Sequence, residues 1–212
     1  MNRRLILLVS TALLVGAAYI LGWSTLFTVS SIEIKGASSQ VSSGIVQGQK
    51  LARVELRAVE AKFETLDWVA NAKVSRNWIN GKVTIELTER TPVATYNNKV
   101  IDSTGKSFIQ RGPTSKDLVQ IQAGDLAAAT KAVTFFMTLP GDPKEALSVV
   151  KVRSTGALVL VVDNGGKNLE IRWGTDGENE LKLKVYKALI ALPENASIKR
   201  VDVSAPHAPI VK

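Results

Sequence analysis

The longest apolar stretch of the chain is an N-terminal run from Leu5 to Phe27, which follows the basic pair Arg3-Arg4. A helix of about 23 residues spans roughly 34 Å at about 1.5 Å per residue, which exceeds the ~30 Å hydrocarbon core of a bilayer. The run therefore predicts one transmembrane helix over residues 5–27. Because basic residues stay on the cytoplasmic side, we expect residues 1–4 to form a cytoplasmic tail and the rest of the chain to be extracytoplasmic.

A cleavable signal peptide is the alternative interpretation of this run. Gly16-Ala17-Ala18 supplies small residues at a possible cleavage site. The apolar positions nevertheless continue beyond that site from Tyr19 to Trp23, which a signal peptide does not require. We therefore expect the run to be retained as a membrane anchor.

Residues 28–91 contain no long apolar run. Their apolar residues instead recur in short segments, some with the period of a strand and some with the period of a helix. Ile32 and Ile34 alternate with polar neighbours and predict a half-buried strand. A short helix around Ile45-Val46 and a longer helix from Leu51 to Leu66 follow, the second with apolar residues on one face and charges on the other.

Two more strands complete this unit, one from Ala72 to Trp78 and one from Val83 to Leu87. Between them lies Asn80-Gly81, a dipeptide typical of the type I′ hairpin turn, which requires positive φ at both central residues. The resulting order, β-α-α-β-β, predicts a three-stranded sheet with two helices on one face.

Residues 92–212 are richer in strands and contain two further helices. The predicted strands occupy residues 93–96, 99–101, 108–109, 149–152, 158–162, 169–173 and 198–203. Asp125 caps the first of these helices, which Pro140-Gly141 stops. Thr175 and Glu178 have the spacing of a capping box at the start of the second helix.

Charge and cysteine content narrow the classes of function. The chain carries 27 Lys+Arg against 19 Asp+Glu, a formal net charge of +8, without any block of five like charges. We therefore expect no dedicated nucleic-acid surface; a mild preference for anionic lipid or cell-wall polymer and ordinary solvated faces explain the charge equally well. The chain has no cysteine, which excludes disulfides, thiolate nucleophiles and thiolate metal sites.

Residues with catalytic potential do not form a recognisable constellation. The single histidine, His207, lies between two prolines near the C-terminus. Gly105-Lys106-Ser107 matches the end of a phosphate-binding P-loop, but Val100 replaces the glycine that the motif requires five positions earlier. Glu86 and Glu89 point in opposite directions on a strand pattern, so they cannot share a proton. We expect no enzymatic activity, cofactor, metal or small-molecule substrate.

Four motifs along the chain resemble a known family. From Trp68 to Trp78 the sequence reads WVANAKVSRNW, and the strand after it runs into Glu89-Arg90-Thr91-Pro92-Val93-Ala94. Asp102-Ser103-Thr104-Gly105 and Val201-Asp202-Val203 follow. In order and spacing the chain resembles the FtsQ family of bacterial cell-division proteins, called DivIB in some lineages, over essentially its whole length. The proline that usually follows the second tryptophan is absent.

The resemblance implies an α+β protein with a POTRA domain over residues 28–91 and a β-domain over residues 92–212. The β-domain would be a curved mixed sheet with helices against it. The implied function is that of a non-catalytic scaffold of the divisome at the division septum. It would recruit FtsB (DivIC) and FtsL, two other single-pass division proteins, and through them the septal peptidoglycan synthases. The alternative is a membrane-anchored POTRA protein of a secretion or assembly pathway.

The resemblance also indicates where partners bind. In the family, the last strands of the β-domain and the adjacent helix take the FtsB segment, which fits addition of a strand to an open sheet edge. The candidate partner-binding residues are Val201, Val203, Ile210, Val211, Lys184 and Lys187. Core packing is an equal alternative for Val201 and Val203.

Three further expectations concern the last strand and the POTRA domain. The outer edge of the last strand is open unless Ile210-Val211 folds back beside it. Arg76 is a candidate POTRA surface contact, with a solvated or a helix-capping side chain as its alternatives. Trp68 and Trp78 are expected to pack in the core and against the hairpin rather than to bind a ligand.

Overall fold

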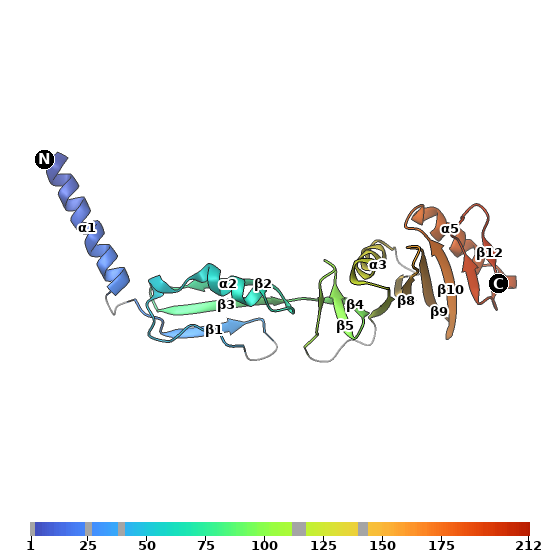
Figure 1. Ribbon diagram of the computed structural model, residues 1–212, viewed down its shortest axis with the longest axis horizontal. Coiled ribbons are helices and arrows are strands. Elements are labelled where there is room, and N and C mark those ends of the chain that lie inside the picture. Colours follow the sequence, from blue (N-terminus) through green and yellow to red (C-terminus); the bar gives the residue numbers. More distant parts are fainter. Residues whose placement is uncertain (1–2, 24–26, 38–40, 112–117, 140–143) are drawn as a thin grey trace. The chain divides into compact units, whose positions relative to one another are not determined.

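The computed structural model describes residues 3–23, 27–37, 41–111, 118–139 and 144–212 (Figure 1). The chain divides into two compact units, Met1–Arg90 and Thr91–Lys212. The first unit holds the N-terminal helix and a small sheet, and the second holds a larger mixed sheet with helices packed against it.

Helix α1, Arg3–Trp23, forms from the N-terminal apolar run. It is the only helix among the described residues that is long and apolar enough to cross a membrane. The helix is continuous through Gly16-Ala17-Ala18, and side chains such as Leu8 and Leu14 are exposed along it. An apolar helix of this length with exposed side chains suits a lipid environment. Residues 24–26 of the predicted span lie outside the described residues.

The small sheet has the strand order β1-β3-β2 within the described part of the first unit. Its strands are β1 Ser31–Lys35, β2 Val69–Arg76 and β3 Lys82–Glu89. Strand β3 is central, parallel to β1 and antiparallel to β2. Its alternate residues Val83, Ile85 and Leu87 are buried, so the predicted alternation is confirmed. Helix α2, Leu56–Glu64, packs against β2 and buries Phe63.

The helical part of this unit differs from the prediction. Residues 45–46 are not helical, and the segment from Leu51 begins as the 3-10 turn η1, Leu51–Arg53, before α2. Leu51, Val54 and Phe63 are still buried as the apolar spacing predicts, but they do not lie on one continuous helix, because Leu51 and Val54 precede α2.

The predicted type I′ turn at Asn80-Gly81 is wrong. Five residues, Asn77 to Gly81, connect β2 and β3, closed by hydrogen bonds from Gly81 N to Asn77 O (3.0 Å) and from Asn77 N to Lys82 O (2.8 Å). Gly81 has a positive φ of 72°, but Asn80 does not. The dihedral requirement of a type I′ turn is met instead at Asn97-Asn98.

In the described part of the second unit, nine strands form one mixed sheet, in the order β12-β11-β10-β9-β8-β7-β4-β5-β6 (Figure 1). The strands are β4 Pro92–Tyr96, β5 Lys99–Asp102, β6 Ser107–Phe108, β7 Val119–Gln122, β8 Leu147–Val152, β9 Leu158–Asn164, β10 Lys167–Gly174, β11 Arg200–Asp202 and β12 Ile210–Val211. Strand β7 is parallel to both β4 and β8, and β10 is parallel to β11.

Two helices of the second unit contribute to the same core. They are α3, Leu126–Thr138, and α5, Asn179–Ile190. Phe135 of α3 and Tyr186 of α5 both join the core cluster, with Phe135 packed edge-to-face on Trp173 of β10 at 5.7 Å between ring centroids. The two helices therefore pack on the sheet through one shared core cluster.

Helix starts were predicted with mixed success. Asp125 is the N-cap of α3, its Oδ1 accepting a hydrogen bond from Ala128 N at 2.7 Å, which confirms that prediction. The stop at Pro140-Gly141 lies outside the described residues. The capping box at Thr175 is wrong, because α5 begins only at Asn179, after Glu178 in a left-handed conformation.

Candidate protein-docking site

The sheet ends at a short strand formed by the chain's tail. Strand β11 is hydrogen-bonded on one side to β10 and on the other to β12, with Val201 opposite Val211 and Asp202 opposite Ile210. The tail therefore folds back beside the last predicted strand. The open edge belongs to β12, not to β11, and any strand added here must pair with β12.

The six candidate partner-binding residues fall into different environments. Val201 and Val203 are fully buried, with 0% of their surface exposed, and belong to the core cluster. Ile210 is 55% exposed, and Val211 is half-buried against the core. Of the four apolar candidates, Ile210 has the side chain most accessible to a partner.

The hydrogen bonds between β11 and β12 determine which backbone groups of β12 point outward. Arg200 and Lys212 exchange two backbone hydrogen bonds of 3.0 Å each. Hydrogen-bonded and non-hydrogen-bonded pairs alternate in an antiparallel ladder, so Val211, opposite Val201, directs its N–H and C=O away from β11. This donor and acceptor lie at the sheet edge, where an added strand would reach them.

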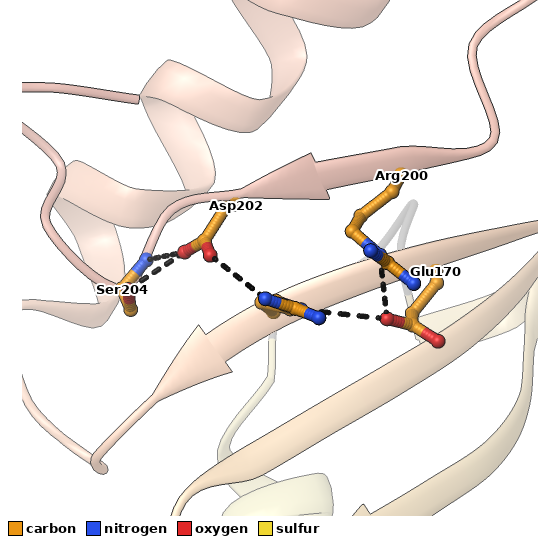
Figure 2. A network of polar contacts seen from close by, with 5 residues as sticks. Glu170, Arg200, Asp202 and Ser204 are labelled. Carbon is orange, nitrogen blue, oxygen red and sulfur yellow. Dashed lines mark hydrogen bonds and ion pairs between the residues drawn. The ribbon is translucent and has the colours of Figure 1, made fainter. Parts of the chain in front are cut away.

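Charged side chains brace β10 and β11 on the solvent face of the sheet (Figure 2). Glu170 Oε1 accepts a hydrogen bond from Arg200 Nε at 2.8 Å and lies 3.5 Å from Arg172 Nε. Arg172 Nη1 is 3.8 Å from Asp202 Oδ2, and Ser204 donates from both N and Oγ to Asp202 Oδ1. These groups are partly exposed, so each pair stabilises little, but together they join neighbouring strands and fix the orientation of the strand next to β12.

Helix α5 carries the two candidate lysines. Lys184 and Lys187 are both exposed. Lys182, on another face of the helix, is buried with its Nζ donating to Thr175 O at 2.7 Å. Burial lowers the pKa of Lys182, an effect opposed by the carboxylates of Glu178 and Asp176. Lys182 therefore anchors the start of α5, while Lys184 and Lys187 face solvent.

In the first unit, the side chain of Arg76 makes contacts within the fold. Its Nη1 donates to the carbonyl oxygens of Leu51 (2.5 Å) and Val54 (3.2 Å), at the end of η1. Its guanidinium also lies 4.7 Å from the ring centroid of Trp78. Arg76 thus caps a helical turn, one of the alternatives foreseen for it. Trp68 is buried in the core, whereas Trp78 is partly exposed on the β2–β3 loop and contacts Phe27.

One feature of the first unit was not foreseen from the sequence. Two carboxylates of α2 reach backbone N–H groups of β2 that point away from β3: Glu60 Oε1 accepts from Val74 N at 2.8 Å, and Glu64 Oε1 accepts from Ala72 N at 3.4 Å. These side chains occupy donors that an incoming strand would use. The signal was present as an i, i+4 glutamate pair on the predicted helix, but its target depends on the tertiary fold.

Residues considered for catalysis do not converge. Within the described ranges, no group of three or more His, Asp or Glu side chains could hold a metal ion. His207 is exposed in the turn before β12. The arrangement at the end of the sheet offers backbone pairing and apolar contact, which suit a polypeptide partner rather than a reaction.

Together, an N-terminal helix long and apolar enough to cross a membrane, a small three-stranded α+β unit and a larger strand-rich unit have the arrangement of a POTRA protein that carries a candidate membrane anchor. Two family models match the chain: the FtsQ-type POTRA domain over residues 27–90 and the C-terminal domain of cell division protein FtsQ/DivIB over residues 92–204. The chain belongs to the FtsQ/DivIB family of cell-division proteins.

Individual relatives agree with this assignment. The chain is 28% identical over 201 residues to cell division protein FtsQ of Corynebacterium glutamicum, covering 86% of this chain and 88% of the relative. It is 25% identical to the FtsQ protein of Mycolicibacterium smegmatis, covering 95% of this chain and 62% of the relative. It is 30% identical to that of Bordetella pertussis, covering 56% and 47%. The chain thus spans less than two thirds of the last two relatives.

Proposed function

We propose that this protein is a non-catalytic scaffold of the division machinery. It would be anchored by α1 with its N-terminus in the cytoplasm, and it would act at the division septum. Family membership supports a role in cell division. The basic residues before the apolar helix support the orientation, and the matched POTRA and β-domains over residues 27–90 and 92–204 support an extracytoplasmic bulk.

The partners we propose are FtsB (DivIC) and FtsL, and through them the septal peptidoglycan synthases. The observation that carries this proposal is the edge of β12. Val211 directs a backbone donor and acceptor outward, beside the exposed side chain of Ile210. An incoming strand would gain backbone hydrogen bonds, each with a net value of about 0.5–1.5 kcal/mol, and Ile210 would select its register. Lys184 and Lys187 on α5 would form the second part of the contact.

The test alters the backbone and the side chains of the edge in separate variants. Val211→Pro removes the outward N–H and part of a half-buried side chain, and proline is tolerated on edge strands. Ile210→Asp places a charge where an apolar contact is needed. Each should weaken binding of the organism's own FtsB homologue by about tenfold or more, equivalent to about 1.4 kcal/mol, in a titration with the full chain in detergent.

Ile109→Asp is the matched control, because Ile109 is also an exposed isoleucine but follows β6 at the opposite edge of the sheet. It should bind normally. If both edge variants bind at wild-type strength with their circular dichroism unchanged, the edge is not the contact. Loss of binding in Lys184→Glu/Lys187→Glu would then move the site to α5. Failure of a fluorescent fusion to concentrate at the septum would contradict the scaffold role itself.

A further inference from the structure

The second unit contains a cleft remote from β12, which we name the α3 cleft. It lies between the N-terminal half of α3 and the β8–β9 turn, with a volume of about 610 Å³, and its lining includes Ala127, Ala128, Lys131, Phe135, Arg153 and Gly156. This volume falls in the range of about 300–1,000 Å³ that is usual for ligand pockets. Five of its lining residues are alanine or glycine, namely Gly124, Ala127, Ala128, Ala132 and Gly156, so parts of the backbones of α3 and of the turn are accessible at close range.

Helix α3 is unusually apolar for a helix at the surface. Its 13 residues include one charged side chain, Lys131. Leu126 and Met137 are 46% and 42% exposed, although Phe135 and its neighbours already supply the buried face. A helix that packs on its own sheet alone normally carries a charged outer face. The outer surface of α3 is therefore suited to a second packing partner.

The charged side chains of the cleft differ in whether they have a partner among the described residues. Asp125 accepts a hydrogen bond from Ala128 N, and Asp176 accepts one from the side chain of Asn179. In contrast, Lys131 and Arg153 make no side-chain hydrogen bond or ion pair with any residue that the structure describes. The two cations border a small-residue surface, and carboxylates on a partner would complement them.

We propose that the α3 cleft docks an acidic amphipathic helix of another protein. Small residues on α3 permit the close approach of a second helix axis, about 8–10 Å away, and Lys131 and Arg153 select for carboxylates beside its apolar face. A second copy of this chain fits less well, because the chain carries a net charge of +8.

This site is separate from the edge of β12. Strand β8, which leads into the cleft turn, is separated from β12 by β9, β10 and β11 in the sheet. Occupation of one site therefore leaves the other accessible, and a single chain can hold two partners at once. The inference does not depend on which protein binds β12.

The test uses the full chain in phosphatidylcholine nanodiscs, with empty nanodiscs as the blank. The probe is a fluorescein-labelled helical peptide of about four turns, with leucines on one face and glutamates beside them, and a companion peptide carries glutamine in place of every glutamate. Fluorescence anisotropy should show that the companion binds at least about tenfold more weakly. Lys131→Glu/Arg153→Glu should weaken the glutamate peptide by a similar factor, and Ala128→Trp should do so by filling the cleft.

Matched controls separate local recognition from net charge. Arg57→Glu/Lys167→Glu changes the total charge equally at two exposed cations outside the cleft and should bind like wild type, as should Ile210→Asp. Equal binding of both peptides, or wild-type binding by the Lys131/Arg153 variant, would overturn the proposal. So would displacement of the peptide by dodecanoate at comparable concentration, which would assign the cleft to a small amphiphile. A dimer in sedimentation that Ala128→Trp abolishes would assign it to a second copy. If Ala128→Trp fails to fold, the charge variants decide.

Discussion

Gly81, in the loop before β3, makes close contact with the segment that precedes β1 in the POTRA unit. Its φ is +72°, and a Cβ added there would lie 2.5 Å from the carbonyl oxygen of Thr28 and 3.1 Å from the Cβ of Ser30. Its carbonyl accepts a hydrogen bond from Ser30 N at 2.9 Å. The glycine is therefore required twice, by its own backbone conformation and by the close approach of the segment before β1.

These two requirements can be separated by substitution. Gly48, in the same unit, has a φ of +85° but no atom within 4 Å of an added Cβ. Gly48→Val should lower the free energy of unfolding by about 1–3 kcal/mol from backbone strain alone. Gly81→Val should lower it further, because the strand entry must also move. Urea denaturation of the full chain in detergent measures both; a loss at Gly81 no greater than that at Gly48 would contradict the close-contact argument.

At the scale of the secondary-structure elements, the glutamate side chains of α2 that accept hydrogen bonds from β2 lead to a prediction about hydrogen exchange. Val74 N is bonded to Glu60, and Ala72 N is bonded to Glu64. Glu60→Ala should accelerate hydrogen exchange at the Val74 amide and leave Ala72 protected, while Glu64→Ala should do the reverse. Glu60→Gln should retain protection, since the amide oxygen can still accept. Exchange measured by NMR that is unchanged in the alanine variants would show that the carboxylates do not cover this edge.

The elements also show which features a sequence pattern can predict. Strand β3 was predicted because alternation reports burial directly, and helix α3 was predicted from local signals, namely the N-cap Asp125 and the stop at Pro140-Gly141. Strand β7 was missed, since its four residues have too short an alternation and become a strand only between β4 and β8. Asn80-Gly81 has the composition of a tight turn, but β2 ends at Arg76 and β3 begins at Lys82, which leaves five residues in the loop.

The candidate site was less predictable than the fold for a related physical reason. A two-residue strand such as β12 has no periodicity, so the folding back of Ile210-Val211 could be named only as an alternative. Burial of Val201 and Val203 likewise depends on which face α5 covers. The glutamates over β2 and the α3 cleft arise from contacts between elements, which no single segment encodes.

On the scale of the whole molecule, retention of α1 is the property that decides where the protein acts. The helix continues without interruption past Gly16-Ala17-Ala18, so we expect it to remain in the mature chain. Alkaline carbonate extraction should leave the protein in the membrane fraction, and mass spectrometry should recover peptides that contain Arg3 and Arg4. A mature chain that begins at Tyr19 would show that the run is a signal peptide.

The strand order of the larger sheet has a consequence for synthesis. Strands β5 and β6 extend the sheet on one side of β4, and β7 is placed on the other side; from β8 through β12, each new strand is then placed beside the one made just before it. Because domains begin to fold as the chain emerges, the sheet can grow in the direction of translation, and the border that ends in β12 is completed last. Under the proposed function, a chain that is clipped before Ile210 would therefore be largely folded, yet it would lack the edge through which we propose that it recruits a partner. Partner binding at β12 would then report that the strands from β7 to β11 are already in place.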